Sequence, residues 1–229
     1  MSTAVAFATL DRQVRAALRT LHNYLWMGEK ADVKKLREDF TAIGARWEAF
    51  LGKKSGVAKN VAARAVKLSR ETEQGGALYG FVSNYWYLTA ATVHLRGKKY
   101  ATAAAACCEA VDGPMIGLAS GFDHHDWVDE KDAGRITYEE YAHRIADLLD
   151  GKGVKNVARF KRLATVVAEL KDDVAVNNVP DQALAVKAAI HTAALFLALY
   201  PEVLEDLGWE TTVPPAEHAR VASFIVSRA

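Results

Sequence analysis

The sequence has only two cysteines, and they are neighbours, Cys107 and Cys108. Adjacent side chains on a helix point in different directions, so these two are poorly placed to form a disulfide. The sequence also has no Cys-x-x-Cys pair and no Cys/His spacing typical of a zinc site. The absence of a disulfide framework suits a reducing compartment, and we expect the protein to be cytoplasmic.

Long apolar runs are also missing. The longest, 188–200, contains His191 and stops at Pro201, which leaves it shorter than the ~20 residues that span a bilayer. The first ten residues have no basic segment ahead of their apolar residues, whereas a signal peptide begins with one. We therefore expect neither a signal peptide nor a membrane partner.

Helix-breaking residues are scarce, with 5 prolines and 15 glycines in 229 residues. Alanine, the best helix former, is abundant. Apolar residues recur three and four apart along most of the chain, most clearly from Val33 to Phe50, and no strand pattern of useful length occurs. The sequence predicts an all-α fold, a compact multi-helix bundle of about eight to ten helices. We take 1–229 as a single helical domain, with a weak candidate boundary near 112–135.

Glycine and proline set the predicted helix ends. The third helix should run over about 57–73 and stop before Gly75, and the fourth should stop at Gly97. The alanine-rich helix that follows should end near Val111. We expect the stretch 112–134 to be irregular and a separate short helix to begin at Pro201.

Basic residues are clustered although the net charge is only +1. Residues 53–70 contain no acid and six cations: Lys53, Lys54, Lys59, Arg64, Lys67 and Arg70. On a helical wheel the last four fall within an arc of about 140°. A second cluster comprises Lys152, Lys155, Arg159, Lys161 and Arg162, of which three share one helical face at spacings of four and three.

The acids lie elsewhere, because residues 126–150 hold eight acids against three bases. Clustered Lys and Arg on helix faces are how proteins contact a phosphate backbone without reading bases. We therefore interpret the two basic clusters as nucleic-acid contacts. A solvated helix face explains the same pattern, and so does a basic face that meets the acidic face of another protein or of a second copy of this chain.

A group of residues of the kinds that bind metal ions lies beyond the alanine-rich helix. Asp123, His124, His125 and Asp126 are consecutive, and His143 lies further on. His and Asp are ligands for transition metals. Four consecutive residues cannot all point at one ion, so a metal site needs a ligand from another helix, such as His143. A polar loop is the other interpretation.

The segment Asp129–Glu140 resembles the calcium-binding loop of the EF-hand family. Asp129 matches position 1, Gly134 position 6 and Glu140 position 12. Lys131 and Ala133 stand at positions 3 and 5, where that family has oxygen ligands. The resemblance implies a calcium site, but the two departures favour a loop that simply leads into the next helix.

Residues 87–114 resemble one tetratricopeptide repeat, a pair of antiparallel helices. The matching positions are Ala91, Gly97, Tyr100, Ala103, Ala110 and Pro114, while Tyr87 stands where that family has tryptophan. No second copy follows at the expected period, and one repeat cannot form a solenoid because each repeat buries its face on a neighbour. An alanine-packed helix pair explains the pattern equally well.

No P-loop, dinucleotide-binding or Ser-His-Asp signature occurs. We therefore expect no catalytic site and no cofactor. The function we expect is that of a non-catalytic helical binding or assembly subunit, part of a larger (ribonucleo)protein complex, that contacts nucleic-acid backbone. Its partners would be nucleic acid and other protein subunits or itself. The alternatives are a metal-dependent enzyme or metal-binding protein using 123–126, and a purely structural component of a viral or multi-subunit assembly.

Overall fold

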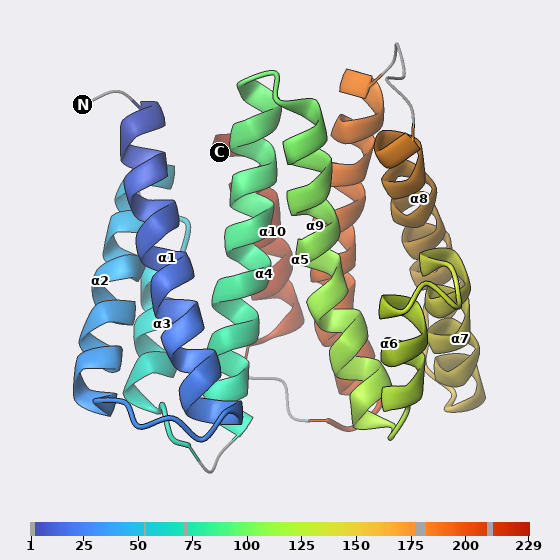
Figure 1. Ribbon diagram of the computed structural model, residues 1–229, viewed down its shortest axis with the longest axis horizontal. Coiled ribbons are helices and arrows are strands. Elements are labelled where there is room, and N and C mark those ends of the chain that lie inside the picture. The colour runs from blue at the N-terminus through green and yellow to red at the C-terminus, as the bar shows by residue number, and fades with distance from the viewer. Residues whose placement is uncertain (1–2, 53, 71–72, 177–181, 210–212) are drawn as a thin grey trace. The chain divides into compact units, whose positions relative to one another are not determined.

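The computed structural model describes the whole chain except residues 1–2, 53, 71–72, 177–181 and 210–212. The described residues form ten α-helices and no strand (Figure 1), which confirms the all-α prediction. The helices are α1 (Thr3–Trp26), α2 (Val33–Leu51), α3 (Val57–Val66), α4 (Glu73–Arg96), α5 (Tyr100–Gly121), α6 (His125–Asp132), α7 (Tyr138–Gly151), α8 (Val157–Val176), α9 (Gln182–Asp206) and α10 (Pro215–Arg228).

The contacts within the chain divide it into two compact units. The first comprises Met1–Trp86 and Arg228, and the second comprises Tyr87–Ser227 and Ala229. The division falls inside α4.

In the first unit, α2 packs against both α1 and α3. The helix α2 begins at Asp32, whose side chain accepts a hydrogen bond from the Lys35 amide at 3.0 Å. Gly44 lets α2 and α3 approach closely, because a Cβ atom at this position would lie 3.1 Å from Cβ of Val61. Large buried side chains then fill the core of this unit, among them Phe40, Trp47, Leu78 and Trp86.

The N-terminus of α3 is capped by a side chain from α2. Gly56, the residue before α3, has no side chain to cap the helix. Instead, the Glu48 carboxylate accepts hydrogen bonds from the amides of Ala58 at 2.9 Å and Gly56 at 3.3 Å. Burial alone would raise the pKa of Glu48, but the hydrogen bonds from Ala58, Ser55 and Gly56 outweigh it and hold the pKa below its ordinary value of 4.5.

Replacing Glu48 by alanine should therefore lower the free energy of unfolding by about 1 kcal/mol at pH 7, the usual loss for a helix N-cap. A carboxylate whose folded pKa is depressed stabilises the fold above its unfolded pKa and loses that effect as pH falls through the folded value. The difference between wild type and Glu48→Ala should thus shrink below pH 4.5. Urea unfolding at pH 7 and pH 3 measures this, and a difference that stays constant between the two pH values contradicts it.

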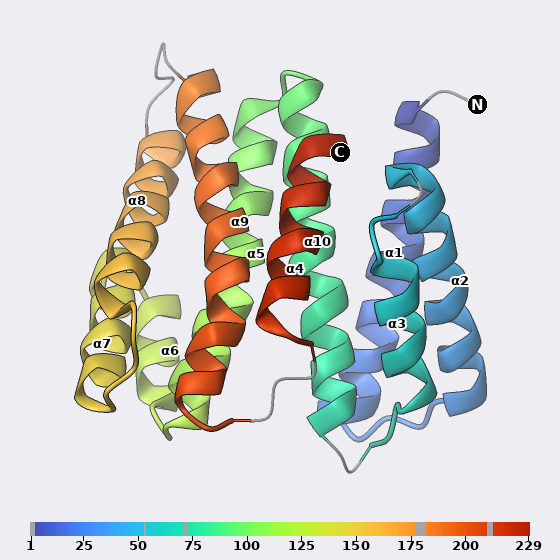
Figure 2. The same cartoon turned by 180° about the vertical axis from the view of Figure 1, so that it is seen from behind.

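In the second unit, α9 packs between α5 and α8, and α7 packs on α8 (Figures 1 and 2). Phe160 of α8 and Phe196 of α9 are both fully buried, with ring centroids 4.8 Å apart. Cys107 of α5 donates a hydrogen bond from Sγ to the carbonyl oxygen of Ala189 at 2.9 Å. These contacts tie the three longest helices of the unit into one core.

Two predicted helix ends were wrong, because proline does not end a helix in either place. α5 continues through Pro114 to Gly121, and α9 continues through Pro201 to Asp206. An internal proline removes one backbone hydrogen bond and strains the helix. Both prolines are buried, and burial of a long apolar helix face outweighs that local cost.

Because α5 continues past Pro114, much of the stretch 112–134 that we expected to be irregular is helical. Its first part belongs to α5 and a further part forms α6. The predicted break at Gly97 is confirmed, since α4 ends at Arg96 and α5 begins at Tyr100. However, α5 runs past Pro114, where a tetratricopeptide repeat would end.

One described helix, α9, is long and apolar enough to cross a membrane by length and composition. The sequence prediction missed this because it counted only 188–200, whereas α9 begins at Gln182. Its most apolar 18-residue window has a mean hydropathy of 1.7, and 44% of that window is buried inside the protein. A core helix meets the same criteria, so the expected lack of a membrane partner stays a prediction.

Candidate nucleic-acid interface

The basic residues of the first unit surround α3. Lys54 precedes this helix, Lys59 lies on it, and Lys67 and Arg70 follow it; all four side chains are exposed. We call these four residues the α3 basic surface. Lys53, the remaining residue predicted there besides Arg64, lies outside the described residues.

Arg64 does not belong to this surface. It is only 6% exposed, and its guanidinium carbon lies 4.7 Å from the centre of the Phe81 ring. Its Nη1 donates a hydrogen bond to the carbonyl oxygen of Asn60 at 3.2 Å. The wheel placed Arg64 beside the lysines, but the close packing of the first unit places its side chain in the core.

The wheel also assumed a helix to residue 73, whereas α3 ends at Val66. Lys67 and Leu68 donate their amides to carbonyls only three residues back, those of Arg64 and Ala65, which tightens the last turn. Leu68 is then fully buried. Lys67 and Arg70 are therefore presented by a turn rather than by a helical face.

A cation that the sequence analysis missed lies at this turn. Arg37 of α2 donates a hydrogen bond from Nη2 to the carbonyl oxygen of Leu68 at 2.7 Å. The guanidinium carbon of Arg70 lies 5.4 Å from the centre of the Tyr24 ring. Only the packing of α2 on α3 brings Arg37 here, because the two residues that bond are 31 positions apart.

The charge of the α3 basic surface is poorly compensated. Lys59 and Lys67 form no ion pair among the residues that the structure describes. Glu48 contacts α3 at its N-terminal turn. The uncompensated positive charge therefore lies on the helix and at its C-terminal end.

The second predicted basic face is not a helical face. α8 begins at Val157, and Asn156 just before it has a left-handed backbone with φ of 61°, so Lys155 lies outside the helix. The amide of Lys155 donates to Asp206 at 2.9 Å and its ammonium pairs with the same carboxylate at 3.2 Å. These two interactions hold the pKa of Asp206 below its ordinary value.

The other cations of this cluster are divided among different partners. Lys152 lies 5.6 Å from the Phe122 ring centre, and Lys161 pairs with Asp147 at 2.9 Å. Arg159 lines a pocket, and Arg162 is exposed on α8. Lys152, Arg159 and Arg162 are exposed, but the cluster does not form the single helical face that the sequence predicted.

Most of the cations within the acidic stretch 126–150 form ion pairs with nearby carboxylates. Lys131 bonds to Asp132 at 2.9 Å and to Asp112 at 3.2 Å. Arg144 bonds to Glu130 at 2.7 Å. These pairs join α6 to α5 and to α7, and the remaining acids leave the surface of the two helices negative.

The metal candidates do not converge on one point. His124 stacks on Trp127 with 3.8 Å between ring centres, and its Nδ1 lies 3.9 Å from Asp126. His143, on α7, has its Nε2 2.8 Å from Oγ1 of Thr165. His125 is exposed at the start of α6. Within the described ranges, no three His, Cys, Asp or Glu side chains are placed to hold a metal ion.

The calcium-loop resemblance does not extend to the structure. Asp129 lies inside α6, which continues to Asp132, whereas an EF-hand ligand loop leaves the helix at its first position. Lys131, at the third position, is already bonded to two carboxylates. Thr137 caps α7 by accepting a hydrogen bond from the Glu140 amide at 3.0 Å, so the segment serves as the connection between two helices.

Tyr141 of α7 is fully buried, and its hydroxyl has no hydrogen-bond partner among the described residues. Burial, followed by the nearby carboxylates of Asp112 and Asp132, raises the pKa of this side chain. A buried polar group without a partner costs about 1–3 kcal/mol. The hydroxyl of Tyr138, by contrast, bonds to Sδ of Met115 at 3.2 Å.

Replacing Tyr141 by phenylalanine should therefore leave the free energy of unfolding unchanged or raise it by about 1 kcal/mol, because only the unpaired hydroxyl is removed. Tyr138→Phe is the matched control and should lose stability, since it removes a made hydrogen bond. Urea denaturation of the two variants beside wild type measures both effects. A loss of more than about 1 kcal/mol in Tyr141→Phe would show that its hydroxyl has a partner.

The structure places this chain in the class of all-α proteins. Its candidate site is the exposed α3 basic surface. In comparisons with protein-family models, with curated proteins and with solved structures, the chain matches none of them.

Proposed function

We propose that this chain is a non-catalytic helical binding subunit that contacts the backbone of nucleic acid through the α3 basic surface. The observation that carries the proposal is that Lys59 and Lys67 are exposed without an ion pair among the described residues. Lys131 and Lys155, by contrast, each pair with an acid. Uncompensated cations on one surface are suited to a row of phosphates.

The binding we propose is electrostatic and indifferent to sequence. Phosphate contacts position a protein on nucleic acid, whereas base-edge contacts specify the sequence. α3 contains no aromatic residue on which a base could stack, and its exposed residues between the two lysines are Ala63 and Val66. The role would be that of a subunit that neutralises backbone charge within a larger ribonucleoprotein complex.

Fluorescence anisotropy with labelled single-stranded RNA, single-stranded DNA and duplex DNA tests this proposal. At about 50 mM salt we expect saturable binding, with dissociation constants that vary by less than about tenfold between ligands of different sequence but the same length and strandedness. The absence of binding to all three at this salt concentration would contradict the proposed function. A strong preference for one sequence would contradict the backbone-contact mechanism.

A further inference from the structure

One side of α9 carries a largely apolar seam whose side chains are exposed or half-buried. Six residues follow each other at spacings of four, three, four, three and four: Leu184, Ala188, His191, Leu195, Ala198 and Glu202. Leu184 is 66% exposed and Leu195 is 43% exposed. This alternation is the spacing with which a helix packs along another helix.

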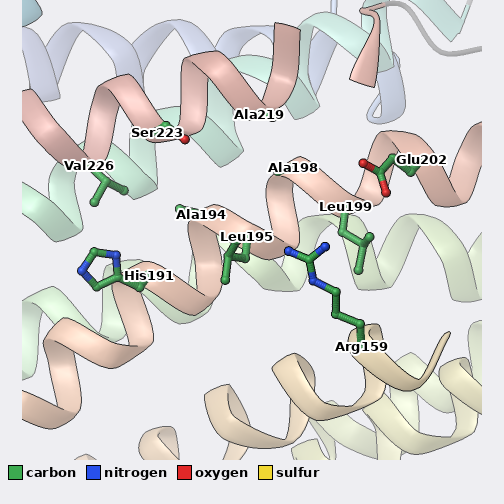
Figure 3. A pocket seen from close by; sticks show the side chains of 10 residues that line it. All are labelled: Arg159, His191, Ala194, Leu195, Ala198, Leu199, Glu202, Ala219, Ser223 and Val226. Carbon is green, nitrogen blue, oxygen red and sulfur yellow. The ribbon is translucent and has the colours of Figure 1, made fainter. Parts of the chain in front are cut away.

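A pocket of about 410 Å³ opens along this seam, between α9 and α10 (Figure 3). Four small residues line it, namely Ala194, Ala198, Ala219 and Ser223. Leu199 and Val226 add apolar walls, and Arg159 reaches toward it from α8 (Figure 3). Small residues leave room for a large side chain from outside, and they let a second helix approach closely.

The charges along the seam limit what can occupy it. His191 lies at one end of the pocket and Glu202 at the other, both exposed on α9 (Figure 3). Neither forms an ion pair among the described residues. Glu202 would repel a polyanion, and burying it in lipid would be costly. The seam therefore fits a partner that places an acceptor opposite His191 and a hydrogen-bond donor or cation opposite Glu202.

A second copy of the same seam meets this requirement. When two α9 helices run antiparallel with His191 opposite the partner's Glu202, Leu195 falls opposite the partner's Ala198, and Ala194 opposite the partner's Leu199. In these two pairs a leucine meets an alanine, and the imidazole of each His191 meets a carboxylate. A two-fold interface requires this self-complementarity, because if one residue contacts a second, the second contacts the first.

We propose that two copies of this chain pair through the α9 seam, with their α9 helices antiparallel about a two-fold axis. Leu195 of each copy enters the pocket between α9 and α10 of the other. This interface lies in the second unit and is independent of the α3 basic surface. Pairing would also place two basic surfaces in one particle, which strengthens contact with a long polyanion through multivalency.

Sedimentation equilibrium of the full chain over about 1–200 µM tests the proposal, and we expect a mass that rises to that of two chains. Leu195→Glu should raise the dimer dissociation constant by about 30-fold or more, the effect of losing a central apolar anchor. Leu195 is partly exposed, so this variant should keep its fold, which circular dichroism verifies. Val66→Glu is the matched control, because Val66 is 70% exposed in the other unit, and it should dimerise like wild type.

A charge exchange tests the antiparallel register. His191→Glu places like charges opposite each other twice and should weaken the dimer, and adding Glu202→Arg should restore it. A wild-type mass of one chain at every concentration overturns the proposal. So does undiminished pairing in Leu195→Glu, loss of pairing in Val66→Glu, or a double variant that pairs no better than His191→Glu alone.

Discussion

Replacing Trp86 by alanine is expected to lower the free energy of unfolding by about 3–5 kcal/mol, the usual range for a buried tryptophan. Trp86 is fully buried. Its ring stacks on Phe7 with 5.5 Å between centroids and meets the edge of Trp47 at 5.3 Å. Its Nε1 donates a hydrogen bond to Asp11 at 2.8 Å. The variant thus opens a large cavity where α1, α2 and α4 meet, and it also removes one of the two hydrogen-bond partners of the Asp11 carboxylate, the other being Arg15.

Trp26→Ala is the matched control for this effect. Trp26 is 54% exposed and contacts the edge of Tyr79 at 5.1 Å, so its loss should cost less than about 1 kcal/mol. Urea unfolding followed by circular dichroism compares the two variants. Similar losses in both would contradict the core described for the first unit.

The second large effect is expected on binding. Lys59→Glu together with Lys67→Glu should weaken nucleic-acid binding by about 100-fold or more at 50 mM salt, because each lost phosphate contact removes the release of about 0.9 counterions. The salt dependence should flatten at the same time, by about two units of slope on a log–log plot. Both lysines are exposed and without ion pairs among the described residues, so the fold should be unaffected.

Lys98→Glu together with Lys99→Glu is the control for this experiment. These two lysines are exposed in the connection between α4 and α5, and their reversal makes the same change in net charge. The control should bind within about threefold of wild type, since binding in this account depends on local phosphate contacts. Equal losses in the two double variants would mean that net charge, and not the α3 basic surface, drives binding.

The fold class could be predicted because it depends on local information. The spacing of apolar residues at three and four, strong alanine content and the break at Gly97 all act within a few residues. The ends of α5 and α9 could not be predicted in this way. Pro114 and Pro201 are locally unfavourable in a helix, and they are tolerated because each lies on a face buried in the second unit.

The candidate site shows the same limit at the level of single residues. A helical wheel places Arg64 on the same face of α3 as Lys59. It cannot show that the Arg64 side chain packs against Phe81 of another helix. It also cannot supply Arg37, which reaches the end of α3 from another helix. The exposed seam of α9 could not be predicted for the same reason. In the sequence its apolar residues look like a buried helix face, and only the packing of the neighbouring helices shows that they are exposed.

The salt dependence of nucleic-acid binding by the wild-type chain tests the central claim most directly. If the four cations of the α3 basic surface each contact a phosphate, affinity for duplex DNA should fall by about 100-fold between 50 and 200 mM salt. Anisotropy titrations at these two concentrations, with the Lys59→Glu and Lys67→Glu double variant alongside, measure the fall. A loss of this size in the wild type, reduced to about tenfold in the variant, is the result we expect. Binding that changes less than about threefold with salt, or no binding at 50 mM, would contradict the account.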